Sequence, residues 1–477
     1  MCNKRLVAGS AVAFLALLPA ASQAQFVIGA NFTGSTKGIQ SNFIPPDTMG
    51  AIGPNHFVET LNGSFRVYDR TGIVLQSKSL DKFWKDATGT QPNVFSFDPR
   101  ILYDASTNRW FATALDNPGV SNNAILLAVS QTADPTGAWT GFRIDSDPTV
   151  KGHWADFDTL GMNGQGIYIS VNAFKTSASS NGITLVAVNK ASLVGGSLTG
   201  SIWYNVDPND TGYSVQPIVD TTGGGTPQNL YSAYNAPAGK FKLSTITGAN
   251  EGNTLNTAGG LINVNAYNDP PLAAQNGGPN TIEAGDTRLG SNLVRVGGNV
   301  WGVETVSSGG RSALRWFRID PTTNTIAEEG IIGDATHDYY EGSIAVNGAG
   351  DVVIGYTRSG DTEYASSYAS TGFFNGVTTA FNAPMLLKAG VASYSVLDGS
   401  GRNRWGDYSA TMVDPTNPSH FWTIQEWASG SNVWSTQITE LVKGPGGAVP
   451  VSGWQTTLIG SGLAGLAWMR RRRAQGA

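Results

Sequence analysis

One antiparallel hairpin pattern recurs along the chain and limits what it can fold into. Its clearest copy begins at Asp407, continues as a short strand over residues 409–413, turns over residues 415–419 and returns from His420. An acidic residue, a short strand, a Pro/Asn/Ser turn and an aromatic return strand are typical of the inner hairpin of a four-stranded antiparallel sheet. Further copies begin at Asp47, Asp98, Asp158, Gln216, Asp286 and Tyr340.

The seven copies lie about 50 to 70 residues apart, a period typical of propeller blades. The 60 glycines and 22 prolines are spread through the chain, as expected where many tight turns join short strands. The predicted fold class is therefore all-β, with residues 25–442 forming one seven-bladed β-propeller.

The last blade lacks an outer strand before the chain reaches its C-terminal linker. Residues 25–32, which precede the first blade, alternate as a strand does. We expect this N-terminal strand to close the last blade, because pairing the two ends leaves no open blade edge. The strands expected are 49–52, 57–61, 65–69 and 73–79 in blade one, 101–103, 110–115, 124–130 and 139–144 in blade two, and 409–413, 421–427 and 433–441 in blade seven.

The composition excludes one class of partner. Charged residues make up 14% of the chain and the net charge is −5, and no basic stripe runs through the propeller region. The electrostatic pattern of a nucleic-acid-binding protein is therefore missing.

Residues 1–24 have the pattern of a secretory signal peptide. Lys4 and Arg5 precede an apolar run over residues 6–18, and Ser22 and Ala24 supply small residues before a cleavage site. The alternative is an uncleaved N-terminal anchor, although the apolar run is shorter than a membrane span requires. The single cysteine, Cys2, lies in this segment, so cysteine chemistry is excluded from the mature protein.

The C-terminus carries a second targeting pattern. Residues 443–452 form a linker, and residues 453–477 contain an apolar stretch followed by four arginines, Arg470 to Arg473. A short apolar span that ends in positive charge is typical of a stop-transfer segment with its arginines on the cytoplasmic side.

This tail resembles the bacterial PEP-CTERM class of sorting signals, with Val449-Pro450, the hydrophobic segment and the arginine cluster in the same order. The resemblance implies recognition by an exosortase, transient anchoring in the inner membrane, and release to the cell surface or an extracellular matrix associated with exopolysaccharide and biofilm. Val451-Ser452 stand where the family usually has Glu-Pro, which leaves the processing enzyme open. The alternative is a plain C-terminal membrane anchor.

Residues 130–139 resemble the Asp-box of sialidase-like propellers, a Ser/Thr-x-Asp turn closed by Gly and Trp, with Thr132, Asp134, Gly137 and Trp139 in order but the glycine one place late. In those families the box lies away from the active site. Its chemistry is structural, because a short Asp side chain caps its own turn and the Trp packs beneath a neighbouring strand. We take this motif as support for the fold alone.

The residues that open the inner strands form the candidate site. Inner strands line a propeller's axis, so the segments that lead into them gather around a central pit. Carboxylates, arginines and aromatic rings in such a pit suit a polar ligand such as a sugar. The candidates are Asp47, Asp98, Arg100, Asp156, Asp158, Asp286, Arg288, Tyr340, Glu341, Arg404, Trp405 and Asp407. The alternative role for the repeated acids is structural, as turn caps or as ion pairs between blades.

The sequence assigns no metal site. His56 and His420 lie in hairpin turns, whereas His153 and His337 precede blade starts, so a shared four-histidine site is not expected. Calcium is the cation that clustered carboxylates would suit. Residues 207–212 begin like a calcium loop but lack the distant acidic ligand, and we interpret them as a turn.

We therefore expect an exported, non-catalytic surface or matrix propeller that binds a carbohydrate or another envelope component. Its expected ligand-binding residues are Asp47, Arg100, Asp158, Arg288, Arg404, Trp405 and Asp407. The alternative is a sialidase-like glycoside hydrolase or a polysaccharide lyase, with Tyr340 and Glu341 as a nucleophile pair and Asp98 as the acid. The arginine motif that normally opens sialidase blades is not present.

Overall fold

Seven antiparallel sheets follow one another along the chain in the computed structural model, which describes residues 25–120, 122–149, 151–225 and 227–444. Blade 1 contains β2 (Met49–Ile52), β3 (His56–Leu61), β4 (Ser64–Asp69) and β5 (Val74–Lys78). Blade 2 contains β6 (Ser96–Asp104), β7 (Arg109–Asp116), β8 (Ala124–Ser130) and β9 (Trp139–Asp145). Blade 3 contains β10 (His153–Met162), β11 (Gly166–Lys175), β12 (Gly182–Asn189) and β13 (Gly200–Val206).

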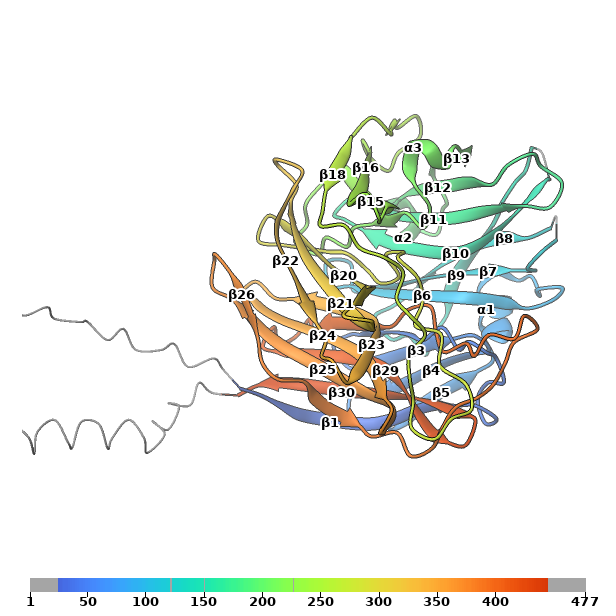
Figure 1. The fold of residues 1–477 in the computed structure, drawn as a ribbon. Helices are drawn as coiled ribbons and strands as arrows, with labels where there is room; N and C mark the ends of the chain where they lie inside the picture. Colours follow the sequence, from blue (N-terminus) through green and yellow to red (C-terminus); the bar gives the residue numbers. More distant parts are fainter. Residues whose placement is uncertain (1–24, 121, 150, 226, 445–477) are drawn as a thin grey trace, which may run out of the picture. The chain divides into compact units, whose positions relative to one another are not determined.

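Blades 4 to 7 follow the same plan, and the ribbon of Figure 1 shows them in colour order. Blade 4 contains β14 (Gln216–Pro217), β15 (Gln228–Asn235), β16 (Lys240–Ile246), β17 (Leu255–Asn256) and β18 (Leu261–Asn263), and blade 5 contains β19 (Val294–Val296), β20 (Asn299–Ser308), β21 (Arg311–Asp320) and β22 (Thr325–Ile332). Blade 6 contains β23 (His337–Val346), β24 (Asp351–Gly360), β25 (Glu363–Phe374), β26 (Thr379–Phe381) and β27 (Met385–Lys388). Blade 7 contains β28 (Ala410–Val413), β29 (His420–Gly430), β30 (Val433–Lys443) and β1 (Phe26–Thr36).

The first strand of each blade contacts the first strand of the next. Contacts join β2 to β6, β6 to β10, β10 to β14, β19 to β23, β23 to β28 and β28 to β2. A parallel bridge between Val219, just after β14, and Val294 of β19 completes the circle. This ring of inner strands confirms the predicted seven-bladed β-propeller.

The N-terminal strand closes the last blade, as predicted. The sheet order is β1-β30-β29-β28, so β1 is the outer strand of a blade whose other strands come from the end of the chain. Glu59 of β3 reinforces this closure, because its carboxylate accepts hydrogen bonds from Ser35 of β1 and from Thr436 of β30. Blade 1 and the closed blade 7 therefore share a buried carboxylate.

The turn residues explain why the strands of blade 2 end close to the predicted positions. Asp104 Oδ1 accepts a hydrogen bond from Ser106 N at 3.1 Å in the turn between β6 and β7. In the Asp-box-like turn between β8 and β9, Asp134 Oδ1 accepts from Thr136 N at 2.9 Å, and the indole of Trp139 donates to Pro135 O at 3.0 Å. These short polar side chains cap their own turns and fix where each strand ends.

The core lies between the sheets, because each blade packs both of its faces against its neighbours. Every residue of β8 is buried, so its sequence shows no polar and apolar alternation. The helix α1 (Leu80–Thr88), which the sequence pattern did not predict, packs outside blade 2, and its Phe83 stacks on Phe65 with ring centroids 4.0 Å apart. Among the described residues, the other two helices are short, α2 (Lys190–Val194) and α3 (Pro208–Thr211).

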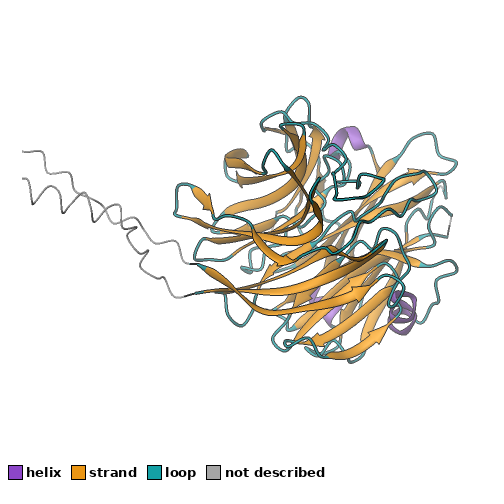
Figure 2. Cartoon of the chain, turned by 60° about the horizontal axis from the view of Figure 1, so that its bottom comes forward, coloured by secondary structure: helices purple, strands orange, loops and turns teal. Residues whose placement is uncertain are grey.

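Blade 5 begins later than the sequence predicted. The copy of the hairpin pattern at Asp286 is not a strand, and the inner strand of this blade is β19. Residues 264–293 instead form a long connection whose backbone pairs with itself through an isolated bridge between Ala273 and Ile282. Figure 2 shows such loops in teal against the orange strands. This connection supplies several walls of the cavity described below.

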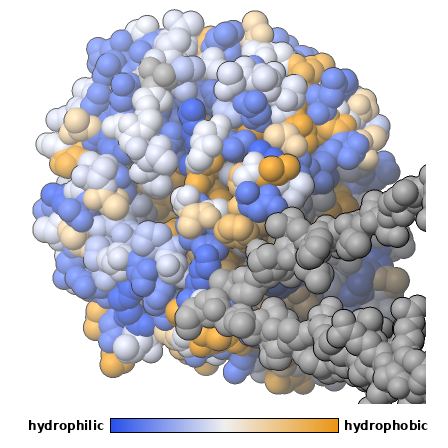
Figure 3. Space-filling view, turned by 90° about the vertical axis from the view of Figure 1, so that its left-hand side faces the viewer, coloured by the Kyte–Doolittle hydropathy of each residue, from blue (hydrophilic) through white to orange (hydrophobic). Residues whose placement is uncertain are grey.

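The two targeting segments predicted at residues 1–24 and 445–477 lie outside the described residues. Residues 27–442 form one unit, and of the second unit only residues 25, 26, 443 and 444 are described. Within the described part of the chain, no helix combines the length and the apolar character needed to cross a bilayer. On the face drawn in Figure 3, hydrophobic residues lie in small groups among hydrophilic ones, as is ordinary for a protein surface in water.

Candidate functional site

A cavity of about 270 Å³ opens where several inner strands begin. Its walls come from the first half of β10, the end of β11, the middle of β20 and of β23, and the connections that precede β19 and β28. The lining residues are Asp156, Phe157, Asn172, Phe174, Glu283, Gly285, Asp286, Arg288, Gly290, Ser291, Val303, Glu304, Thr305, Glu341, Gly342, Arg402, Arg404 and Asp407. The cavity therefore brings together residues that are far apart in the sequence.

The backbone kinks in the same way at the start of four blades. Asp47, Asp98, Phe157 and Glu341 all adopt left-handed conformations, with φ between 50° and 53°. In β6, β10 and β23 this kink coincides with a shift of the strand register. Non-glycine residues adopt this conformation at an energetic cost and tend to cluster at functional sites.

Two of the predicted site residues, Asp47 and Asp98, join neighbouring blades. Asp47 Oδ1 accepts from Asp407 N at 2.9 Å, and its Oδ2 accepts from Asn62 Nδ2 at 2.6 Å. Asp98 Oδ2 accepts from Phe157 N at 3.0 Å. Both carboxyls are buried and neither lines the cavity. As it lies, Asp98 is not positioned as the catalytic acid, and both residues hold adjacent blade starts together.

Arg100 and Asp158 lie in the interior and do not line the cavity. Arg100 Nε donates to Asp158 O at 3.0 Å and its Nη1 donates to Gly290 O at 2.9 Å. The guanidinium also lies 3.5 Å from the ring centroid of Tyr408. Burial raises the pKa of Asp158 to about 7. The ligand contacts that the sequence predicts for these two residues are not found, because both side chains are buried within the protein and away from the cavity lining.

Tyr340 and Trp405 are also buried, contrary to the expected roles. The Tyr340 hydroxyl donates to Ser359 Oγ at 3.1 Å. Trp405 is 1% exposed, and its ring meets Tyr394 edge to face at 5.0 Å. The two residues share one hydrophobic cluster. Trp405 thus offers no ring face to a sugar, and Tyr340 does not pair with Glu341 in the cavity.

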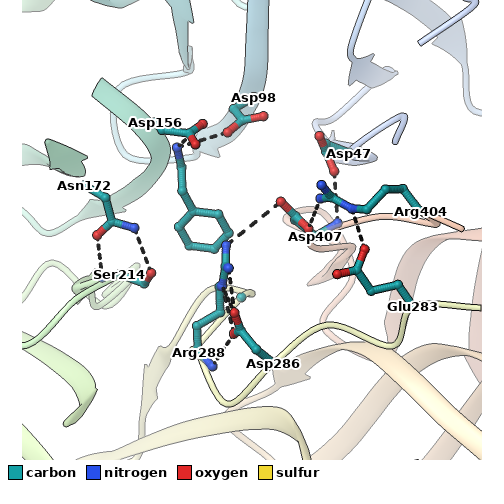
Figure 4. A network of polar contacts seen from close by, with 12 residues as sticks. Asp47, Asp98, Asp156, Asn172, Ser214, Glu283, Asp286, Arg288, Arg404 and Asp407 are labelled. Carbon is teal, nitrogen blue, oxygen red and sulfur yellow. Dashed lines mark hydrogen bonds and ion pairs between the residues drawn. The ribbon is translucent and has the colours of Figure 1, made fainter. Parts of the chain in front are cut away.

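Six of the twelve candidate residues do line the cavity: Asp156, Asp286, Arg288, Glu341, Arg404 and Asp407. Arg404 Nη2 lies 2.7 Å from Asp407 Oδ1, and Arg288 Nη1 lies 4.0 Å from Asp407 Oδ2. Figure 4 shows this network, in which Arg404 also bonds to Glu283 and Arg288 to Asp286. Arg288 is the more accessible arginine, with 35% of its side chain exposed.

Two of the carboxyls that line this cavity, Glu341 and Asp407, have opposite electrostatic environments. Burial and the nearby charges of Asp407 and Glu426 raise the pKa of Glu341 well above its usual value. Although burial opposes it, the positive charges of Arg404 and Arg288 lower the pKa of Asp407. The protonated form is therefore favoured at Glu341 and the charged form at Asp407.

Glu341 has an oxygen that no protein group satisfies. The residue is 8% exposed, and its Oε1 accepts no hydrogen bond within the described chain. Gly285 makes room for it, since a Cβ on that glycine would stand 3.2 Å from this oxygen. An unpartnered, buried polar atom in a cavity wall is unusual in a native structure.

Several site residues were not predicted from the sequence. Glu283 lies in the long connection before β19, and Glu304 lies within β20. Burial raises the pKa of Glu304 to about 7. Glu426 of β29 is buried beside the cavity and accepts from Thr48 Oγ1 at 2.8 Å. A signal existed, because Glu304 and Glu426 are single carboxylates inside otherwise uncharged second strands.

No histidine of the described chain lines the cavity. His153 is buried, with Nδ1 2.8 Å from Asp147 and Nε2 2.9 Å from Ser180 O. At the opposite end of blade 7, ligand atoms of Asp414, His420 and Glu440 lie within 4.8 Å of one another. Asp414 is already paired with Arg70, and His420 Nδ1 lies 2.8 Å from Glu440. We assign no metal to this group.

No protein-family model and no curated protein sequence matches the chain. Solved structures of propeller enzymes are similar to it at low identity. A mutant of Trypanosoma rangeli sialidase with trans-sialidase activity is 12% identical over 80% of this chain, with a TM-score of 0.35, and the chain spans 57% of that protein. A GH43 endo-arabinanase from Bacillus licheniformis is 12% identical, with a TM-score of 0.32 over 71% of this chain and 97% of that one.

The soluble aldose sugar dehydrogenase from Escherichia coli, in its apo form, is 10% identical, with a TM-score of 0.35 over 88% of this chain and all (100%) of that one. At these identities and scores, the similarities identify no ligand or activity for this chain. Its function has to be inferred from its own cavity.

Proposed function

We propose that this protein binds a carbohydrate in the central cavity without altering it chemically. The observation that carries this proposal is the cavity lining, which offers hydrogen-bond donors and acceptors side by side. Arg288 and Arg402 supply N–H donors, Asp286 and Asp407 supply carboxylate acceptors, and Glu341 supplies an oxygen without a hydrogen-bond partner in the described chain. Sugar hydroxyls both donate and accept, so a mixed lining suits them better than a lining of one charge.

The cavity's size and rings agree with a sugar as ligand. A volume of about 270 Å³ is at the small end of ligand pockets, where a single sugar ring fits. Phe174, which is partly exposed, lines its wall, and aromatic side chains pack against the apolar faces of sugar rings. Phe157 is 2% exposed beneath the Arg288 guanidinium and offers no ring face to a sugar. The cavity also lies at the blade starts, where propeller loops collect around the axis.

We further propose that the ligand belongs to the cell envelope or an extracellular matrix. The support is the pair of targeting patterns at residues 1–24 and 453–477, which predict export and processing by an exosortase-type enzyme. A carbohydrate-binding protein on the cell surface or in the matrix agrees with this predicted export. Processing of the C-terminal tail and the final location of the protein remain separate proposals.

Glycoside hydrolysis is the second candidate, and the opposite pKa shifts of Glu341 and Asp407 favour it. In an inverting reaction, Glu341 would give its proton to the leaving oxygen as the glycosidic bond breaks. Asp407 would take a proton from the attacking water. We favour binding because Asp407 Oδ1 is ion-paired with Arg404 at 2.7 Å, which weakens it as a base.

Replacing Arg288 with alanine should weaken glycan binding roughly 10- to 100-fold, because a charged hydrogen-bond donor is lost from the cavity wall. The measurement is a glycan array followed by titration calorimetry on the best ligand. Arg143→Ala is the matched control, since Arg143 pairs with Asp116 at 2.7 Å and is 29% exposed, but lies on the outer strand β9. Equal loss in both variants, or no binding by the wild type to any glycan, would contradict the proposal.

A further inference from the structure

A second hollow lies next to the central cavity. It has a volume of about 440 Å³ and is lined by residues 233–237, Asn268, Asp269 and Thr287. Residues 233–237 include the end of β15 and the turn that leads to β16. We call this hollow the side groove.

A single residue separates the side groove from the central cavity. Asp286 and Arg288 line the central cavity, whereas Thr287 between them lines the side groove. Thr287 N donates to Asp269 Oδ1 at 3.3 Å, which fixes this dividing residue to the far wall of the groove. The two hollows therefore lie on either side of this one segment.

The side groove has the chemistry of a sugar subsite. Tyr234 is 37% exposed, a large fraction for an aromatic ring at the end of a strand. Lys242 Nζ lies 5.1 Å from its ring centroid and donates to Asn209 O at 3.0 Å, which holds the ring in place. The exposed side chains of Asn268 and Asp269 supply polar groups beside this ring.

We infer that the ligand is a carbohydrate chain of two or more units, with one unit in the central cavity and the next stacked on Tyr234. This inference rests on the proposed carbohydrate binding. The observation that carries it is that residues 286–288 form a boundary shared by the two hollows, since Asp286 and Arg288 line one and Thr287 lines the other. A monosaccharide would fill only the central cavity and would leave the exposed ring of Tyr234 unused.

The test is a titration of monosaccharides, disaccharides and hexasaccharides of the same composition against wild type, Tyr234→Ala and Arg288→Ala. Tyr234→Ala should lower the affinity for disaccharide and hexasaccharide about tenfold, because one stacking contact is lost, and should leave the monosaccharide unchanged. Arg288→Ala should weaken all three. Tyr213→Ala is the matched control, since Tyr213 is 45% exposed on blade 4 but does not line the groove.

The outcomes separate this inference from the proposed function. Equal affinity of Tyr234→Ala and wild type for the hexasaccharide would overturn the side groove as a subsite while carbohydrate binding stands. An equal loss with Tyr234→Ala and Tyr213→Ala would also overturn it. Failure of the wild type to bind any saccharide would overturn both.

Discussion

Replacing Glu59 with alanine should destabilise the whole propeller by at least about 3 kcal/mol, because several buried donors lose their acceptor at once. Its carboxylate is fully buried and accepts from Ser35 N at 3.0 Å, Ser35 Oγ at 2.8 Å and Tyr68 Oη at 2.6 Å, and also from Thr436 Oγ1. These donors belong to β1, β4 and β30, so the substitution loosens the joint at which the ring closes. Chemical denaturation measures the effect.

Glu363→Ala provides the comparison for this substitution. Glu363 is a partly exposed carboxylate of β25 that pairs with Arg358 at 2.7 Å. Loss of a partly exposed ion pair should cost no more than about 1 kcal/mol. If Glu59→Ala and Glu363→Ala unfold at the same denaturant concentration, the ring does not depend on this closure. Deletion of residues 25–33 should have at least the effect of Glu59→Ala, since it removes most of β1.

The second large effect is on pH dependence: the propeller should become more stable as the pH falls from 8 to about 5.5. Burial raises the pKa of Asp158 and of Glu304 to about 7, and burial with the charge of Asp407 raises that of Asp47 to about 7. A raised folded-state pKa means that the fold favours the protonated form. This stability is fully present below the ordinary pKa near 4 and is lost as the pH rises through 7.

Carboxylates with lowered pKa values do not reverse this trend. Asp414 and Asp407 have lowered pKa values, so their contribution is present above the ordinary pKa and is constant between pH 5 and 8. Thermal unfolding at several pH values across this range measures the net effect of both groups of carboxyls on the melting temperature. A melting temperature that is flat or that falls toward pH 5.5 would contradict the prediction.

Asp158→Asn isolates one of these groups. Its Oδ2 accepts from Thr113, whereas its Oδ1 has no hydrogen-bond partner within the described chain. An asparagine keeps the acceptor and removes a charge whose burial costs on the order of 4 kcal/mol at pH 8, from the pKa change to about 7. The variant should therefore show a flatter stability profile. Asp69→Asn, at an exposed turn, should leave the slope between pH 5 and 8 unchanged.

The blade architecture could be predicted because turn chemistry is local. The pattern predicted residues 49–52 and 124–130 as strands with the bounds that β2 and β8 have. It failed at Asp286, where an acid-x-arginine repeat looked like a blade start. There the motif forms an ion pair within itself, with Arg288 Nη2 2.6 Å from Asp286, and the chain continues as a connection to β19. Local spacing alone does not distinguish these two uses.

The sequence could not predict which individual side chains point into the cavity and which point into the core. Alternation along a strand assigns neighbours to opposite faces, but the kink at Glu341 shifts the register between Tyr340 and Ser343. The sequence therefore grouped Tyr340 with Glu341, although only Glu341 reaches the cavity. The predicted role of Trp405 in ligand binding is wrong for a related reason. A Trp beside charged residues in the sequence is typical of a sugar-binding surface, but the side chain of Trp405 is buried.

The propeller topology predicted that these acids gather near the axis. It did not predict which of them are structural and which is available to a ligand. Asp47 and Asp98 bond to backbone amides of neighbouring blades, whereas Glu341 keeps a free oxygen in the cavity. All three share the same backbone conformation and the same place in their blades. Only the distances to neighbouring amides separate the structural acids from the one available to a ligand.

The most direct test of the central claim is mass spectrometry of glycans recovered after long incubation with the protein at pH 5, 6, 7 and 8. Binding without chemistry predicts that every bound glycan is recovered intact. Shortened glycans that appear with the wild type and are absent with Glu341→Gln would contradict the claim, and would make Glu341 the acid of a glycoside hydrolase.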